Sequence, residues 1–243
     1  MIDILAFGAH PDDIEITMAG SILAFRRQGL SVGICDLCAG EAGTYGTPEI
    51  RRRELARAAE LLGLSARVTL DLPDGSIRNG EESRLKVIEV LRRLRPEIVF
   101  TFDETPGRHP DHHNAGMIVR EAAFLAGLEK IETDHPPFRP SALVRFPELI
   151  AWRKPDFVID ITDFWEQKQA AIRAHASQVT AENENDTNTK TFIRSNRFWE
   201  VLEAQNKLAG AMIGARYGEP FYYNRPLRVD DIRTIYTAGL EPK

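Results

Sequence analysis

The chain has 243 residues, of which 43% are hydrophobic and 28% charged, an ordinary globular composition that excludes disorder over the whole chain. A net charge of −5 argues against a nucleic-acid partner, since such proteins carry basic surfaces. No apolar run reaches the roughly 18 residues of a membrane-spanning helix, and the first residues lack the basic segment of a signal peptide. With two cysteines only, we expect a cytoplasmic protein without a disulfide framework.

Strands and helices alternate along the first half of the chain. Apolar runs predict strands at 2–9, 31–38, 67–72 and 97–102. Helical spacing of apolar residues predicts helices at 17–28, 48–62, 81–94 and 111–126, with Pro48 at a helix start and Gly63 at its end. This alternation is typical of a Rossmann-like α/β fold with an open, mostly parallel sheet and helices on both faces. No G-x-G-x-x-G follows the first strand, so a dinucleotide site is not expected.

The second half of the chain is less regular. It offers strands at 142–146 and 157–161, helices at 164–174 and 197–215, and an extended tail at 219–229. The polar segment 181–190 is expected to be an exposed loop that could close over a site. Without repeats or a linker, we expect one domain over 1–243, with a Rossmann-like half at 1–127 and an irregular C-terminal extension at 128–243.

Two short segments carry most of the chemical signal. The first is A-H-P-D-D at residues 9–13, and the second is R-H-P-D-H-H at residues 108–113. Alone, either would most often be a turn that caps a helix. The two segments follow the first and fourth predicted strands, and in open α/β sheets the ligand crevice lies outside the strand ends where strand order reverses. We therefore expect these distant loops to face one another and to form a site.

The residues of these loops suit a catalytic zinc ion, one per chain. His10, Asp13 and His112 supply two imidazoles and a carboxylate and leave one coordination position for water; the same donors also suit Fe(II). Asp12 is the expected general base that takes a proton from this water. His109 would be held close to His112 by their spacing of three residues. Its protonated ring would stabilise the oxyanion or protonate the leaving amine.

The other charged residues near the motifs receive supporting roles. Asp111 would hydrogen-bond a histidine or cap its helix, and Glu15 could do either. Arg108 and Arg51 could grip a substrate carboxylate by paired hydrogen bonds, although Arg51 also suits a solvated helix face.

A structural role is expected for the remaining candidates. Cys35 and Cys38 lie three apart on a predicted buried strand and so point to opposite faces, which disfavours a redox or metal site. His113 points about 100° away from its neighbour His112 on the helix. His175 is expected to be a structural histidine.

At these residues the chain resembles the LmbE-like, or PIG-L, family of zinc-dependent N-acetylglucosamine deacetylases. The family patterns A-H-P-D-D-x-E and H-P-D-H stand intact at 9–15 and 109–112, and further similar segments lie at 40–44, 48–54, 72–75, 174–178 and 217–221. The resemblance implies zinc ligands at His10, Asp13 and His112. It also implies that Asp12 is the base and that His109, with Asp111 behind it, stabilises the oxyanion.

The combination of segments is most similar to the subgroup that deacetylates N-acetylglucosaminyl-malate in bacillithiol biosynthesis. The resemblance then implies a small amino-sugar substrate, contacts to it from Arg51, Asp74 and Arg108, and a homo-oligomer, a trimer or hexamer. Chitobiose- and mycothiol-type amides remain alternatives. A two-metal phosphoesterase would need a second ligand set, which the strand ends do not offer. A non-catalytic sugar-binding module would need neither Asp12 nor His109.

Overall fold

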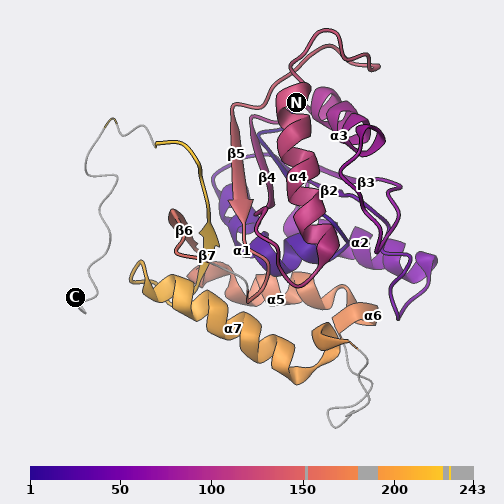
Figure 1. Cartoon of the computed structure of the whole chain (residues 1–243). Helices are drawn as coiled ribbons and strands as arrows, with labels where there is room; N and C mark the ends of the chain where they lie inside the picture. Colours follow the sequence, from indigo (N-terminus) through magenta and orange to yellow (C-terminus); the bar gives the residue numbers. More distant parts are fainter. Residues whose placement is uncertain (151–152, 180–190, 227–229, 231–243) are drawn as a thin grey trace.

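A five-stranded parallel sheet lies at the centre of the computed structural model, which describes residues 1–150, 153–179, 191–226 and 230 (Figure 1). The strands run in the order β3-β2-β1-β4-β5, and each pairs in parallel with its neighbour. Their bounds are Ile4–Gly8 (β1), Val32–Asp36 (β2), Ala66–Thr69 (β3), Ile98–Phe102 (β4) and Ala142–Phe146 (β5). The open α/β sheet is confirmed. Its strand order reverses between β1 and β4, the two strands that precede the histidine motifs.

Two pairs of helices cover the sheet. They are Asp13–Arg27 (α1), Pro48–Leu62 (α2), Glu81–Leu94 (α3) and Pro110–Leu125 (α4). α1 packs against α2, and α3 packs against α4. Right-handed crossovers place the two pairs on opposite faces, because the chain moves from β1 towards β3 and then returns to β4 on the other side. β1 and β2 are therefore buried along their whole length, as their uninterrupted apolar sequences predicted.

The start of α1 differs from its prediction. The helix begins at Asp13, four residues before the predicted start, because the backbone N–H of His10 donates to Asp13 Oδ2 at 2.8 Å and closes the preceding turn. A kink at Met18, with φ −144°, separates this first turn from the apolar part of the helix. The spacing of apolar residues therefore predicted only the part of α1 that follows this first turn. The earlier start fixes the direction of the acidic side chains in the first motif.

The second half of the chain completes the sheet and adds a smaller unit beside it. β5 forms the edge of the central sheet, although it falls within the expected extension. Phe157–Asp160 (β6) and Gly218–Phe221 (β7) form a separate antiparallel pair that was not predicted. Around it lie Thr162–Phe164 (η1), Trp165–Arg173 (α5), Ala176–Val179 (α6), Phe192–Arg194 (η2) and Asn196–Ala211 (α7).

The end of α7 also differs from its prediction. The helix ends at Ala211, four residues early, and Gly214 then takes a positive φ of 73° that reverses the chain towards β7. The loop expected at 181–190 and the end of the expected tail, 227–229, lie outside the described residues. None of the described helices has the length and apolar character of a membrane span.

A buried ion pair joins the smaller unit to the sheet. Glu219 on β7 accepts hydrogen bonds from the backbone N–H groups of Gly20 and Ser21, at 3.1 and 2.7 Å, at the middle of α1. The ammonium group of Lys168 on α5 donates to the same carboxylate at 2.5 Å. Both side chains are almost completely buried, so each charge depends on the other. This contact fixes α5 and β7 against α1, which carries the first histidine motif.

Candidate metal centre and its pocket

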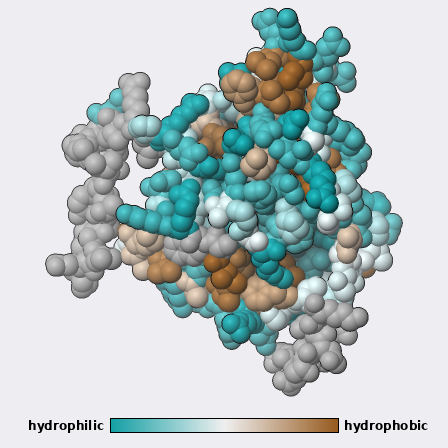
Figure 2. All heavy atoms as spheres, in the orientation of Figure 1, coloured by the Kyte–Doolittle hydropathy of each residue, from teal (hydrophilic) through white to brown (hydrophobic). Residues whose placement is uncertain are grey.

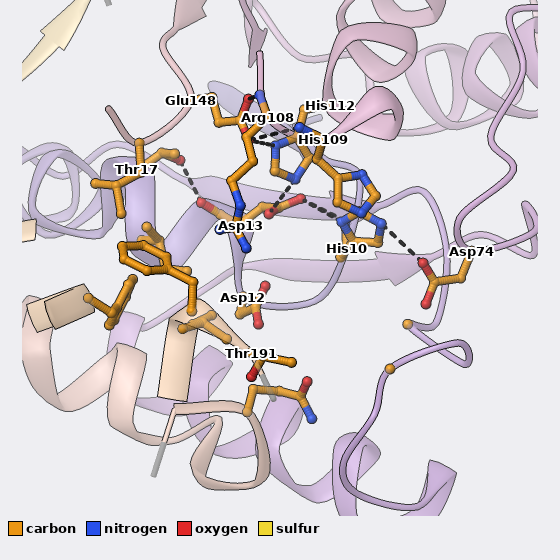
Figure 3. Close-up of a pocket in the computed structure, with 18 of the residues that line it drawn as sticks. His10, Asp12, Asp13, Thr17, Asp74, Arg108, His109, His112, Glu148 and Thr191 are labelled. Atoms are coloured by element: carbon orange, nitrogen blue, oxygen red, sulfur yellow. Dashed lines mark hydrogen bonds and ion pairs between the residues drawn. The ribbon is translucent and has the colours of Figure 1, made fainter. Parts of the chain in front are cut away.

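A cavity of about 500 Å³ lies at the carboxyl ends of β1 and β4 (Figure 3). The two histidine motifs meet in it, as the strand order predicts. The predicted site residues that line it are His10, Asp12, Asp13, Arg51, Asp74, Arg108, His109 and His112. Asp111 and Glu15 do not line it and lie behind its wall. The volume is within the 300–1,000 Å³ typical of small-molecule sites.

The three expected metal ligands lie together at the base of this cavity. Asp13 is between the two imidazoles, with Oδ2 3.4 Å from His10 Nδ1 and Oδ1 3.1 Å from His112 Nε2. Ligands of a tetrahedral zinc ion with bonds of about 2.0–2.1 Å are about 3.3 Å apart, close to these two distances. Ligand atoms of His10, His109 and His112 also lie within 4.8 Å of one another. The Thr17 hydroxyl donates to the Asp13 carbonyl at 2.7 Å, and the His112 ring stacks on Phe102 at 4.2 Å. Asp13 is thereby held within α1, and His112 is held against β4.

Negative charge gathers around His10. Its Nε2 lies 3.1 Å from Asp74 Oδ1 and 3.2 Å from Asp111 Oδ2, and its Nδ1 faces Asp13. Burial disfavours the imidazolium, but hydrogen bonds to these three carboxylates outweigh it and raise the pKa of His10 far above its usual range. For His112, burial acts in the same way, and Asp13 raises the pKa to about 9. The cluster therefore demands positive charge. A divalent metal ion bound to neutral imidazoles would supply this charge, so the donor atoms of His10, Asp13 and His112 fit such an ion.

Cys38 lies close to the expected metal ligands, although its predicted place in a buried strand did not indicate this. Its sulfur and ligand atoms of His10 and Asp74 are within 4.8 Å of one another. Burial raises the pKa of the thiol to about 12, and the S–H contacts the Ala9 carbonyl at 3.2 Å. A neutral thiol is a poor metal ligand. Both cysteines are buried and free, which agrees with the structural role expected for them.

Asp12 lies beside the ligand set in a constrained conformation. Its φ of 113° falls in the left-handed region, which costs a non-glycine residue energy and occurs most often at functional sites. The side chain is buried. Burial and the charge of Asp13 raise the pKa of Asp12 to about 7. A carboxylate with a pKa near neutrality suits a general base.

A buried charged network stands behind Asp12. Glu15 Oε1 lies 2.6 Å from Arg67 Nη1 and 3.2 Å from His175 Nε2. Arg67 also grips both oxygens of Asp36, at 2.9 and 3.0 Å. Glu15 therefore belongs to this network, and it neither caps its helix nor contacts the metal ligands.

His109 is close to the expected ligands, and its surroundings disfavour the positive charge that was expected for it. Its ring centroid is 4.7 Å from that of His10 and 5.0 Å from that of His112. Burial and the charges of those two rings lower its pKa. Nδ1 of His109 accepts the backbone N–H of Asp111 at 3.2 Å, which places the ring proton on Nε2. Nε2 of His109 is therefore the ring nitrogen that can donate a hydrogen bond in the pocket.

The carboxylate of Asp111 contacts His10, whereas its backbone N–H supports His109. Besides its contact with His10, its carboxylate accepts the backbone N–H groups of Gly75 and Ile77 at 2.8 and 3.2 Å. Asp111 therefore orients a ligand and also holds the loop after β3, which carries Asp74.

The two arginines predicted to bind substrate differ in whether their guanidinium groups already have hydrogen-bond partners in the protein. Arg51 is buried, and its guanidinium donates to the carbonyl oxygens of Gly40 and Pro11, at 2.6 and 3.4 Å. It is largely engaged in holding two loops. Arg108 is exposed at the pocket, with its guanidinium 5.0 Å from the centre of the Phe192 ring. Arg108 is therefore the freer cation.

The sequence did not reveal Glu148. This residue accepts the backbone N–H groups of Arg108 and His109, at 2.6 and 3.1 Å, and its Oε1 lies 3.1 Å from His112 Nδ1. A Cβ at Gly107 would overlap its Oε2, so a larger residue there would require the Glu148 side chain to move. Glu148 follows β5, the neighbour of β4. The same strand-end rule that found the motifs could therefore have found it.

The comparisons with known proteins bear on the family to which the chain belongs. The family model PIG-L, described as GlcNAc-PI de-N-acetylase, matches residues 5–123. The diacetylchitobiose deacetylase of Thermococcus kodakarensis is 31% identical over 238 residues, covering 89% of this chain and 80% of that protein. The solved structure of the conserved protein TT1542 from Thermus thermophilus is 37% identical, with a TM-score of 0.85 over 94% of this chain and 97% of the other.

Two further relatives differ in the reaction or substrate that their names state. A 4-oxalmesaconate hydratase of Pseudomonas putida is 29% identical over 72% of this chain and 73% of that protein. A Bacillus cereus protein named "Probable N-acetyl-alpha-D-glucosaminyl L-malate deacetylase 2" is 25% identical over 81% of this chain and 96% of its own length. The identity to the chitobiose deacetylase over four fifths of its length decides the family. The chain belongs to the PIG-L family and is a deacetylase.

Proposed function

We propose that the chain removes the acetyl group from an N-acetylglucosaminide with the help of one divalent metal ion, zinc, bound by His10, Asp13 and His112. The observation that carries the proposal is the arrangement in one cavity of this ligand set, a buried carboxylate and an imidazole N–H donor. Asp12 is the carboxylate, and His109 is the donor. The named activity of the T. kodakarensis relative supports the sugar.

The residues around the metal site divide the work of amide hydrolysis. The ion, when bound, polarises the acetamide carbonyl and makes water more acidic. Asp12 takes the proton of the attacking water, which forms the new C–O bond. His109 donates its Nε2–H to the oxyanion. As the C–N bond breaks, the proton held by Asp12 passes to the leaving amine, and acetate and the free amino sugar result.

The malate glycoside of N-acetylglucosamine is the more specific candidate. Its two carboxylates call for cations near the pocket, and Arg108 is the exposed arginine that lines it in the described part of the chain. Arg51 lines the pocket as well, but its guanidinium already binds two carbonyl groups. One free arginine is a weaker carboxylate site than the expected two, so the malate compound belongs in a panel beside diacetylchitobiose and a mycothiol-type amide.

Acetate release and metal content together test the proposal. The purified chain is loaded with zinc or Fe(II) and incubated with the panel, while the metal per chain is counted. We expect one ion per chain and metal-dependent acetate release, with loss of the ion in the double variant His10→Ala/His112→Ala. Hydration of 4-oxalmesaconate without acetate release from any amide would overturn the proposal.

A further inference from the structure

One wall of the pocket is hydrophobic and takes no part in the chemistry derived above. Its residues come from α1, the segment after β5, η2 and the start of α7, and we call them the apolar wall: Ile16, Leu149, Ile150, Phe192, Ile193 and Phe198. Figure 2 shows hydrophobic surface between the lower end of the sheet and α7. Hydroxyl groups of a simple sugar gain nothing from such a surface, because they would lose their hydrogen bonds to water.

Ile150 shows that this wall is held in place at a cost. It has a φ of 76°, a left-handed conformation that is a genuine outlier for a β-branched residue. Its side chain is 59% exposed, and its backbone N–H donates to Gln205 Oε1 on α7 at 2.8 Å. Backbone strain of this kind persists where the surroundings impose it, most often at ligand sites. A ligand that covers Ile150 would remove apolar surface from water.

Aromatic contacts connect the apolar wall to the reacting centre. The Phe192 ring lies edge-on to Phe198, with centroids 6.0 Å apart, and the Arg108 guanidinium lies over Phe192. Arg108 directly precedes His109, the proposed oxyanion partner. A group that extends from the reacting amide or from the sugar therefore meets the wall without leaving the pocket.

We infer that the physiological substrate is an N-acylglucosaminide that carries an apolar group, alkyl or aryl, bound by the apolar wall. This inference rests on the proposed function and narrows its substrate class to compounds other than the malate derivative, whose aglycone is a dicarboxylate. Two parts of the substrate could supply the group: the acyl chain on the nitrogen or the aglycone on the sugar. Both have the same chemistry towards the wall, and substrates modified at one end at a time distinguish them.

The experiment measures release of the free amine from three compounds. They are N-acetylglucosamine, its hexyl glycoside and N-hexanoylglucosamine, assayed with the metal-loaded enzyme. Burying a methylene group is worth about fourfold in binding. We therefore expect kcat/KM for one hexyl compound to exceed that for N-acetylglucosamine by roughly 10–100-fold. The hexyl compound with the higher kcat/KM shows which end of the substrate contacts the apolar wall.

Two variants separate the wall from a general hydrophobic effect. Ile150→Asn removes the apolar side chain but tolerates the left-handed backbone, and it should reduce the hexyl advantage roughly tenfold. Phe124→Asn is the matched control, since Phe124 is 58% exposed on α4 and does not line the pocket; it should keep the advantage. The inference is overturned if N-acetylglucosamine is cleaved and neither hexyl compound has a higher kcat/KM. It is also overturned if Ile150→Asn keeps the higher kcat/KM for a hexyl compound. Either result leaves the proposed function standing. No amine from any compound overturns both.

Discussion

Replacement of Glu148 tests how the metal ligands are held. In the wild type, the Glu148 carboxylate lies 3.1 Å from Nδ1 of His112 and accepts two backbone N–H groups of the loop that carries His109. Glu148→Ala removes the carboxylate that faces the outer nitrogen of a ligand and frees the loop. Substitutions of such outer partners lower metal affinity about 10–100-fold. That range corresponds to about 1.4–2.7 kcal/mol, comparable to the loss of one or two hydrogen bonds to a charged acceptor.

The assay is competition for zinc between the protein and a chromogenic chelator. Glu148→Ala should bind zinc roughly 10–100-fold more weakly than the wild type, and Glu148→Gln should fall between them because its amide oxygen still accepts one N–H. Glu166→Ala is the control, since it removes an equal charge at an exposed position on α5. Zinc binding by Glu148→Ala within twofold of the wild type would refute a positioning role for this residue.

Four further outcomes follow from the buried charges. Asp12→Asn should lower kcat about 10²–10⁴-fold in the acetate assay, a loss that residual wild-type-like turnover would contradict. Folding raises the pKa of Asp12 from about 3.8 to about 7. Ionisation of Asp12 therefore lowers the free energy of unfolding in full above pH 7 and not at all below pH 3.8. In thermal unfolding without metal, Asp12→Asn should be more stable than the wild type by about 2–4 kcal/mol at pH 8 and should differ little from it near pH 4. For the same reason kcat/KM should fall on the acid side as Asp12 takes up a proton, and a pH profile that rises towards pH 5 would speak against this base. Lys168→Ala should lower the free energy of unfolding by about 3–5 kcal/mol in urea, because Glu219 then keeps a buried charge without its partner; a loss below 1 kcal/mol would show that the pair is dispensable.

The local features of the chain could be predicted because their causes lie within a few residues. Pro48 and the Thr47 side chain, which accepts the Ile50 N–H at 3.3 Å, set the start of α2, and Gly63 with φ 60° sets its end. The apolar runs predicted the strands of the central sheet, since a strand covered on both faces needs no polar side chains. The two histidine motifs and their meeting place followed from their position at strand ends.

Contacts between distant segments could not be predicted in the same way. Arg51 looked like a substrate ligand or a solvated residue, and only the loops at Gly40 and Pro11 show why it is buried. The pairing of β6 with β7 joins residues about 60 positions apart, and no local pattern encodes it. Ile150 reads as an ordinary hydrophobic residue until the fold places it, exposed and left-handed, beside the pocket.

The sequence by itself determined the open sheet, the ligand types and the adjacency of Asp12 to Asp13. The sheet follows from the period of apolar side chains, and the other two follow from the identity and order of the residues, all of which are local properties of the chain. The tertiary structure alone decided how the charges act: it buried Asp12, surrounded His10 with three carboxylates and placed Glu148 against His112. Electrostatic interactions depend on distance and burial, and both are set only when segments far apart in the chain pack together.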